Sequence, residues 1–192
     1  TPVQTIKNLK FFMPGKHNLS NAVAALAMAL ASGCNPLKLR AALKTYKGVE
    51  RRFSYRIKTE SFVFIDDYAH HPKEIDAVWE AVREMYPQKK VTAVFQPHLY
   101  SRTLDFAEDF AVSLSKFDAV LLLDIYPARE TPIDGVTSDL LLQKITTQIK
   151  QLVQKSNLAP AITSIGNPIL ITMGAGDIGH EVEPLTKNLM YA

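Results

Sequence analysis

The chain has 192 residues, of which 47% are hydrophobic, and its formal net charge at neutral pH is +3. This length suits one domain and part of another, and the small, scattered charge excludes a basic surface for nucleic acid. The single cysteine, Cys34, excludes an internal disulfide and a thiolate metal cluster, and no apolar run is long enough to span a membrane. We therefore expect a cytoplasmic protein without nucleic-acid or membrane partners.

The first part of the chain predicts a strand followed by two helices. Apolar residues alternate loosely over residues 1–14, which favours a strand. An alanine-rich helix is predicted over Asn18–Ala31, ended by Gly33, and a second helix over Pro36–Lys47. The pattern then changes to that of strands, so we place a domain boundary near residue 50. The predicted domains are residues 1–50 and 51–192.

The rest of the chain alternates strands and helices. Strand-like apolar runs are predicted over residues 53–57, 62–65, 92–95, 120–123 and 169–173. Apolar residues recur at helical spacing over Pro72–Tyr86, Thr103–Lys116, Ser138–Gln154 and Ile178–Leu189. This alternation predicts an α/β fold, a doubly wound and mostly parallel sheet with right-handed crossovers.

Polar, chemically capable turns follow the predicted parallel strands. These turns are Asp66–Pro72, Gln96–Arg102, Asp124–Glu130 and Gly174–Asp177. The carboxyl ends of parallel strands share one edge, and open α/β sheets bind their ligands there. We expect one cleft at this edge, formed by Asp67, His70, His98, Arg102 and Asp124.

The residue types in these turns suit the binding of nucleotides and anions. Asp67 could accept hydrogen bonds from ribose hydroxyls, because an ionised carboxylate is only an acceptor. The histidines before Pro72, His70 and His71, either occupy the cap region of the next helix or donate to phosphate or carboxylate oxygens. Arg102 either covers a helix end or clamps a carboxylate or phosphate with two hydrogen bonds.

Two other interpretations concern the same turns. The loop with Tyr126, Arg129 and Glu130 is equally compatible with a substrate contact and with a solvated loop. A metal site from His70, His71, His98 and Asp124 is not predicted, because adjacent side chains usually point apart and no spacing matches a known ligand set.

Two glycine-containing strings resemble nucleotide-binding motifs, but each lacks a part of the motif that it resembles. Gly174–Gly179 matches the dinucleotide fingerprint, yet only 13 residues follow it, too few for the second strand of that motif. A tight turn from strand to helix is the better interpretation. Gly15-Lys16 precedes His17 where a phosphate loop has Ser or Thr, and Lys10 stands in place of its first glycine. We predict no phosphate loop in this chain.

Several strings, in order along nearly the whole chain, resemble the muramyl ligases. They are GKHNLSNA at 15–22, RRF at 51–53, DDYAHHPKEI at 66–75, FQPHLYSRT at 95–103 and DIYPARE at 124–130. The resemblance implies that residues 1–50 are the end of a central ATPase domain and that 51–192 are the Rossmann-like C-terminal ligase domain. It also implies that the chain, lacking the family's phosphate loop, is a fragment that is inactive alone.

The resemblance further implies an ATP-dependent ligase of peptidoglycan precursor synthesis, which acts in cell wall biogenesis. In this family type, ATP phosphorylates the carboxylate of UDP-N-acetylmuramate and the amine of L-alanine attacks the acyl phosphate. Mg²⁺ would be held mainly by the missing central domain. Nucleotide contacts would come from His17, Asn18, Asn21, Arg52 and Asp67. Substrate contacts would come from Tyr68, His70, His98 and Arg102, with His70 and Arg102 acting in catalysis.

The resemblance leaves some alternatives open. Leu99 stands where some relatives carry a second arginine, so we expect a different carboxylate clamp here. Within the family, a ligase that recycles preformed peptides is the alternative, and the string FQPHLYSRT argues against it; outside the family, a non-catalytic nucleotide-binding module is the alternative. We also expect a hinge at Gly48–Arg52 and exposed apolar residues on the first helical pair, or their burial by another copy of the chain.

Overall fold

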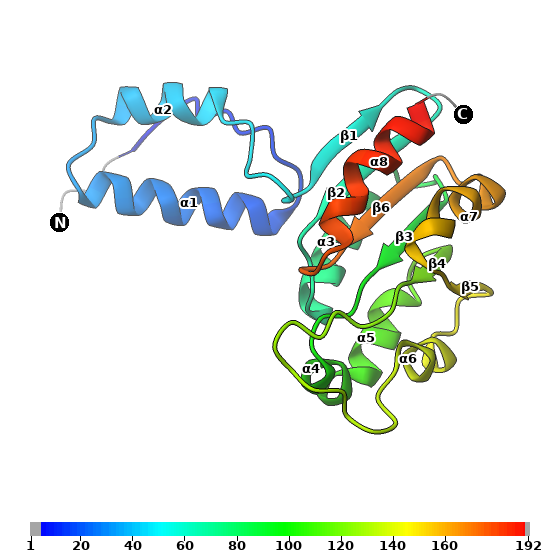
Figure 1. Ribbon diagram of the computed structural model, residues 1–192. Helices are drawn as coiled ribbons and strands as arrows, with labels where there is room; N and C mark the ends of the chain where they lie inside the picture. Colours follow the sequence, from blue (N-terminus) through cyan, green and yellow to red (C-terminus); the bar gives the residue numbers. More distant parts are fainter. Residues whose placement is uncertain (1–4, 191–192) are drawn as a thin grey trace. The chain divides into compact units, whose positions relative to one another are not determined.

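The computed structural model describes residues 5–190, which divide between Val49 and Glu50 into two compact units (Figure 1). The first unit is a hairpin of helices α1 (Lys16–Ala31) and α2 (Pro36–Thr45). The turn between them contains Gly33 at a φ of 83°, in the left-handed region that favours glycine. Asn35 then caps α2, because its side chain accepts a hydrogen bond of 2.9 Å from the Leu37 amide.

The strand predicted over residues 1–14 is wrong for the part that the structure describes, and residues 1–4 lie outside it. Residues 5–14 form neither strand nor helix. A strand needs a neighbour for its backbone groups, and the helical hairpin offers none. These residues are instead held by side-chain packing, such as the stacking of Phe11 on Tyr46 at 6.3 Å between ring centroids.

The hairpin leaves much apolar surface exposed. Among residues 5–49, Ala22 alone is buried. The exposed large apolar side chains are Leu9, Phe12, Leu19, Val23, Met28, Leu37, Tyr46 and Val49. Helices of this length gain most of their stability from tertiary packing, and this hairpin has little of it within the first unit.

The second unit is built on one six-stranded sheet in the order β1-β2-β6-β3-β4-β5. The strands are β1 (Ser54–Lys58), β2 (Val63–Asp67), β3 (Val91–Phe95), β4 (Ala119–Leu122), β5 (Ile149–Leu152) and β6 (Ile169–Met173). β1 runs antiparallel to β2, and every other neighbouring pair is parallel. The predicted α/β class with a mostly parallel sheet is therefore confirmed.

Helices cover both faces of this sheet (Figure 1). α7 (Leu158–Ile165) and α8 (Ile178–Met190) pack on one face, where Leu158, Ile162 and Val182 join strand residues in one apolar core. The helices of the other face are α3 (Pro72–Met85), α4 (Tyr100–Asp105), α5 (Ala107–Leu114) and α6 (Ser138–Lys144). A 3₁₀ turn, η1 (Lys155–Asn157), precedes α7. Over residues 5–190, no helix has both the length and the apolar composition needed to cross a membrane.

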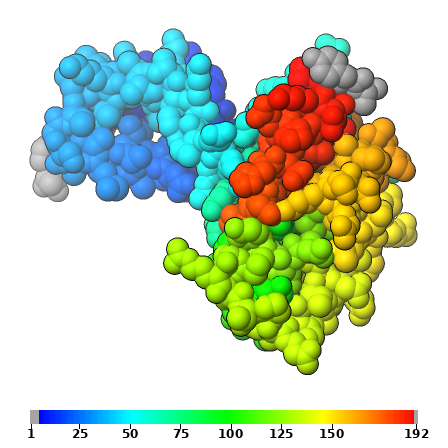
Figure 2. All heavy atoms as spheres, in the orientation of Figure 1, coloured from blue at the N-terminus to red at the C-terminus, as the bar shows by residue number. Residues whose placement is uncertain are grey.

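The central strands end level with one another. Met173 of β6 is paired with Asp67 of β2 and with Phe95 of β3, and Phe95 is paired with Leu122 of β4. The segments after these four strands therefore all leave from the same edge. After β4, the residues from Pro127 to Arg129 are exposed, and the yellow-green segment that contains them protrudes from the surface in Figure 2.

The helix predicted over Ser138–Gln154 is wrong beyond Lys144. Strand β5 follows, because the free edge of β4 offers backbone partners. The β-branched run Ile145-Thr146-Thr147 lies between α6 and β5 and disfavours continuation of the helix. The Lys150 ammonium donates to the carbonyls of Leu142 and Ile145 at the end of α6, so the helix is closed by a side chain.

Other boundaries also differ from the prediction. The helix predicted over Thr103–Lys116 begins earlier, at Tyr100, and is divided into α4 and α5 at Phe106, whose ψ of 21° departs from the α-helical value. Asp66 and Asp67, predicted to lie in a turn, belong to strand β2 and are 0% and 4% exposed. Their position inside the strand changes what their carboxylates contact.

Candidate functional site

Asp66 and Asp67 hold the segment Arg51–Phe53 against the end of β2. The Asp67 carboxylate accepts hydrogen bonds from the amides of Phe53 (2.7 Å) and Ala69 (2.8 Å). Asp66 accepts from the Arg51 Nε at 3.1 Å. Arg51 and Phe53 have φ values of 56° and 50°, a conformation that costs about 1 kcal/mol or more in a residue other than glycine. The two carboxylates therefore stabilise a backbone that the local sequence disfavours.

The environment of Asp67 also alters its acidity. Burial raises the pKa of Asp67 from its ordinary 3.8 to about 6, although the amides of Phe53 and Ala69 and the charge of Arg52 oppose the rise. Asp67 is therefore a weaker acid inside the fold than an exposed aspartate. The two hydrogen bonds do not use all of its acceptor capacity, since a carboxylate can accept about four.

An exposed aromatic ring lies beside this segment. The Tyr68 ring is 36% exposed, and the guanidinium carbons of Arg51 and Arg52 lie 5.1 and 5.9 Å from its centroid. Both distances are within the range of a cation–π contact. The Arg52 side chain is exposed beside this ring, as a residue available to an anionic ligand would be.

Two histidines from different turns meet at the sheet edge. His70, just before α3, shares a hydrogen bond of 2.9 Å between Nδ1 and the Tyr68 carbonyl, and its amide donates to Glu74. The centroids of the His70 and His98 rings are 6.1 Å apart. Two imidazole rings that are 28 positions apart in the sequence therefore lie close together at this edge of the sheet.

Arg102 lies against the second of these histidines. Its Nη1 is 3.4 Å from the His98 Nδ1; His98 lies just before α4, and Arg102 is in the first turn of that helix. Partial burial and the positive charge of Arg102 lower the pKa of His98, so that the ring is uncharged at neutral pH. Leu99, between them, has a φ of 74°, a value in the left-handed region that residues with a β carbon disfavour.

The loop after β4 contributes two more residues to this group, Tyr126 and Glu130. Tyr126 pairs with the loop after β3 through hydrogen bonds of 2.9 Å to the Pro97 carbonyl and from the Leu99 amide, and its ring stacks on His98 at 5.6 Å. Glu130 accepts hydrogen bonds from the amide and hydroxyl of Ser101, and these bonds lower the pKa of Glu130. We name the group of His70, His98, Arg102, Tyr126 and Glu130 the edge cluster.

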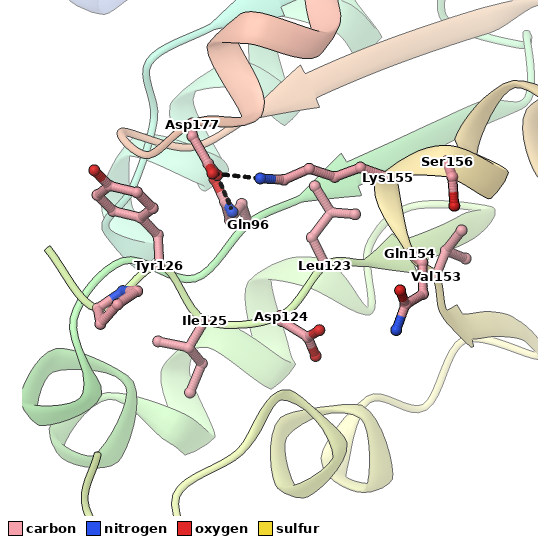
Figure 3. A pocket seen from close by; sticks show the side chains of 11 residues that line it. Gln96, Leu123, Asp124, Ile125, Tyr126, Val153, Gln154, Lys155, Ser156 and Asp177 are labelled. Carbon is pink, nitrogen blue, oxygen red and sulfur yellow. Dashed lines mark hydrogen bonds and ion pairs between the residues drawn. The ribbon is translucent and has the colours of Figure 1, made fainter. Parts of the chain in front are cut away.

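A pocket of about 390 Å³ lies on the other side of Tyr126 (Figure 3). Its polar walls come from Gln96, Asp124, Lys155, Ser156 and Asp177. Asp177 pairs with Lys155 and accepts a hydrogen bond of 2.7 Å from Gln96 Nε2, as the dashed lines in Figure 3 show. Although burial opposes it, hydrogen bonds from Lys155 and Gln96 lower the pKa of Asp177.

The glycines between β6 and α8 allow close packing within the protein. A β carbon on Gly176 would lie 2.6 Å from the Cγ of Tyr126, and one on Gly174 would lie 2.9 Å from the Gln96 carbonyl oxygen. One on Gly179 would lie 2.8 Å from an Arg51 nitrogen. Each distance is too short for a real β carbon, so side chains here would displace Tyr126, Gln96 or Arg51. The interpretation as a tight turn agrees with this geometry.

Comparison with known proteins places this geometry in a family. Residues 51–176, which contain the edge cluster, match the family described as "Mur ligase, glutamate ligase domain". The chain belongs to the Mur ligase family. It is 61% identical over 191 residues to the UDP-N-acetylmuramate–L-alanine ligase of Christiangramia forsetii, and the match covers 100% of this chain and 42% of that protein. This Mur ligase chain thus spans less than half the length of that relative.

Solved structures give the same fold. The UDP-N-acetylmuramate-alanine ligase of Thermotoga maritima is 26% identical and superimposes with a TM-score of 0.77 over 95% of this Mur ligase chain and 40% of its own. A murein peptide ligase from Psychrobacter arcticus, 21% identical, has a TM-score of 0.67 over 94% of this chain and 38% of its own. At this lower identity the likeness is one of fold.

The structure brings most of the predicted edge residues of the Mur ligase chain together. His70, His98 and Arg102 lie in the edge cluster, and Tyr68 and Asp67 precede His70 at the same strand end. Asp124 instead lines the pocket beyond Tyr126. The predicted nucleotide residues His17, Asn18 and Asn21 lie on α1 in the first unit, where the Asn18 side chain donates to the Pro14 carbonyl at 2.7 Å.

Sequence reasoning missed part of the pocket in this Mur ligase chain. Lys155 and Ser156 were not predicted as site residues. The helix predicted through Gln154 covered the positions where the structure has strand β5, and η1 follows that strand. The β-branched run at residues 145–147 was a signal that could have indicated the end of the helix before the strand. Gln96 and Asp177 were placed in turns, but nothing in their sequence spacing indicated that they bond to each other.

Metal ligands are not gathered in the part of the chain that the structure describes. Within residues 5–190, no three side chains of His, Cys, Asp or Glu lie closely enough to hold a metal ion. The Mg²⁺ that the family resemblance implies therefore has no fitting donor set among these residues.

Proposed function

We propose that this chain is the amine-binding part of an ATP-dependent ligase that joins L-alanine to UDP-N-acetylmuramate in peptidoglycan precursor synthesis. The observation that carries the proposal is the edge cluster, in which Arg102, His98 and His70 converge at the carboxyl edge of the sheet. Its support is the 61% identity to a relative with that name, together with the family match. Because the chain covers 42% of that relative, the reaction is proposed for the larger protein.

Arg102 is proposed to bind the carboxylate of L-alanine. Its planar guanidinium can donate two parallel hydrogen bonds, which fit the two oxygens of a carboxylate. Glu130 lies on the neighbouring loop and both of its carboxylate oxygens are engaged by Ser101, which leaves the guanidinium fork available to a ligand. Leu99 adds no donor, and Arg102 is therefore proposed to act as the main cation for this carboxylate.

The histidines are proposed to orient the attacking amine. The reaction needs an uncharged amine aimed at the carbonyl carbon of the acyl phosphate, and the leaving group is then phosphate. His98 is uncharged at neutral pH because its pKa is lowered, so its Nδ1, which faces the Arg102 Nη1 at 3.4 Å, can accept a hydrogen bond from the amino group once Arg102 turns to the carboxylate. His70, 6.1 Å away between ring centroids, is proposed to contact the acyl phosphate as a donor through Nε2 in its imidazolium form, because its Nδ1 donates to the Tyr68 carbonyl.

The nucleotide is proposed to contact the residues around Tyr68. Arg52 is exposed beside this ring and can donate to phosphate or ribose oxygens, and Asp67 retains acceptor capacity for a ribose hydroxyl. His17, Asn18 and Asn21 are proposed to contact the adenine. The chain contains no phosphate-loop motif, so we propose that it has no ligase activity alone.

A chimera tests the proposed function directly. The matching 191 residues of the Christiangramia forsetii ligase would be replaced by this chain, and phosphate release measured with ATP, UDP-N-acetylmuramate and L-alanine. We expect turnover that requires all three substrates, with the unaltered ligase as the positive control. A folded chimera that turns over with an L-alanyl peptide but not with L-alanine would instead favour the peptide-recycling activity. No turnover with either would contradict the proposal.

A further inference from the structure

Tyr126 separates two compartments at the sheet edge. On one side its ring stacks on His98, with an angle of 29° between the ring planes. On the other side the ring packs so closely on Gly176 that a β carbon there would be 2.6 Å from the Tyr126 Cγ. The pocket of about 390 Å³ is lined by Tyr126 but not by His98 or Arg102. The tyrosine therefore forms a partition between the edge cluster and this pocket.

The partition is held by the backbone as well as by the ring. Tyr126 exchanges hydrogen bonds of 2.9 Å with the loop after β3, through its own amide and carbonyl. The residue is therefore anchored at both groups, and replacement of its side chain leaves these bonds available. Removal of the ring alone is expected to join the two compartments.

We propose that Tyr126 sets the size of the amino acid that the site accepts. This inference rests on the proposed function. With Arg102 holding the carboxylate and His98 the amino group, the side chain of a longer amino acid is proposed to extend toward the pocket and to meet the Tyr126 ring, which stacks on His98 and lines that pocket. A methyl group needs no such space. Selection against larger side chains then comes from steric exclusion by a fixed ring.

The pocket behind the ring has a definite chemistry. Lys155 is paired with Asp177, whereas Asp124, on the opposite wall, is exposed and has no hydrogen bond or ion pair among the interactions of residues 5–190 (Figure 3). Ser156 and Gln154 add hydroxyl and amide groups. A wall set with both charges and neutral polar groups suits an uncharged polar side chain, which can both donate and accept. L-glutamine is therefore the probe of choice.

The test compares the use of L-glutamine and L-alanine by the chimera and by its Tyr126→Ala variant. We expect the ratio of kcat/KM for L-glutamine to that for L-alanine to rise at least about tenfold in Tyr126→Ala, within the range that hydrophobic pocket changes give. In Tyr126→Phe, which keeps the ring, the ratio should stay as in the parent. Should Tyr126→Ala prove insoluble, Tyr126→Val carries the same test, because it also shortens the side chain.

The outcomes separate this inference from the proposed function. If the parent chimera fails to use L-alanine, the proposed function fails and the inference falls with it. If the parent uses L-alanine and the ratio in the shortened variants is unchanged, the size-selection role alone is overturned. Loss of all turnover in folded Tyr126→Ala, or a raised ratio in Tyr126→Phe, would also overturn it, because the hydroxyl or another function of the ring would then be required.

Discussion

Replacement of Asp67 by asparagine should change how the stability of the second unit depends on pH. The Asp67 carboxyl binds its proton more tightly in the folded chain, where its pKa is about 6, than in the unfolded chain, where it is near 3.8. Ionisation of this group therefore opposes folding. The stability that its protonated form contributes is fully present below about pH 4 and is lost as the pH rises through about 6.

The magnitude follows from the two pKa values. A difference of about two corresponds to about 3 kcal/mol in full, and roughly half of this falls between about pH 5 and pH 8. An asparagine side chain cannot ionise, so the Asp67→Asn variant lacks this dependence. The variant also keeps only one acceptor oxygen for the amides of Phe53 and Ala69, which should destabilise the fold by about 1–3 kcal/mol when one amide is left unpaired.

The assay is urea unfolding at about pH 5 and pH 8, followed by the fluorescence of Trp79, the single tryptophan, on α3 of the second unit. We expect Asp67→Asn to be the less stable protein at the lower pH, and its deficit in free energy of unfolding to shrink by about 1–2 kcal/mol at the higher pH. Asp109→Asn, at an exposed position of α5, is the control. A deficit that stays constant within about 0.5 kcal/mol would refute the assigned burial of an ionisable Asp67.

Two further predictions concern the chain as it stands. The purified chain should release no phosphate from ATP above a blank, with or without UDP-N-acetylmuramate and L-alanine, because it has no phosphate loop; substrate-dependent release would contradict this. Gly176→Ala should lower the free energy of unfolding by about 1–3 kcal/mol, because its β carbon would overlap Tyr126 and Gln96. Unchanged stability in thermal unfolding followed by circular dichroism would contradict that packing.

The parts of the fold that could be predicted from sequence are those with a local signal. The buried strands β3 and β6 are continuous apolar runs, and α3 has apolar residues at helical spacing, so their existence followed from the pattern. Parallel topology then placed His70, His98 and Arg102 at one edge. Strand β5 gave a weaker signal, because its apolar residues also fit a helical spacing. Its pairing with β4 depends on tertiary contacts and not on the local sequence.

The details of the site depended on contacts that no spacing encodes. Asp67 binds the amide of Phe53, 14 positions earlier, because the backbone there adopts left-handed torsions in non-glycine residues. The approach of Tyr126 to Gly176 joins loops 50 positions apart. A glycine string of this kind matches a nucleotide fingerprint by composition, and only the neighbours of each glycine distinguish close internal packing from a phosphate site.

The kinetics of Arg102→Ala in the chimera test the central claim, that the edge cluster binds the carboxylate of L-alanine. Loss of a charge-assisted contact should cost about 1.5–3 kcal/mol, or roughly ten- to a hundredfold in kcat/KM for the affected substrate. We expect the KM for L-alanine to rise by such a factor while the KM for ATP stays within about twofold, and Asp67→Ala to show the reverse order. If Arg102→Ala weakens the use of ATP and L-alanine equally, or affects neither, Arg102 is not the carboxylate clamp and the assignment of the edge cluster is wrong.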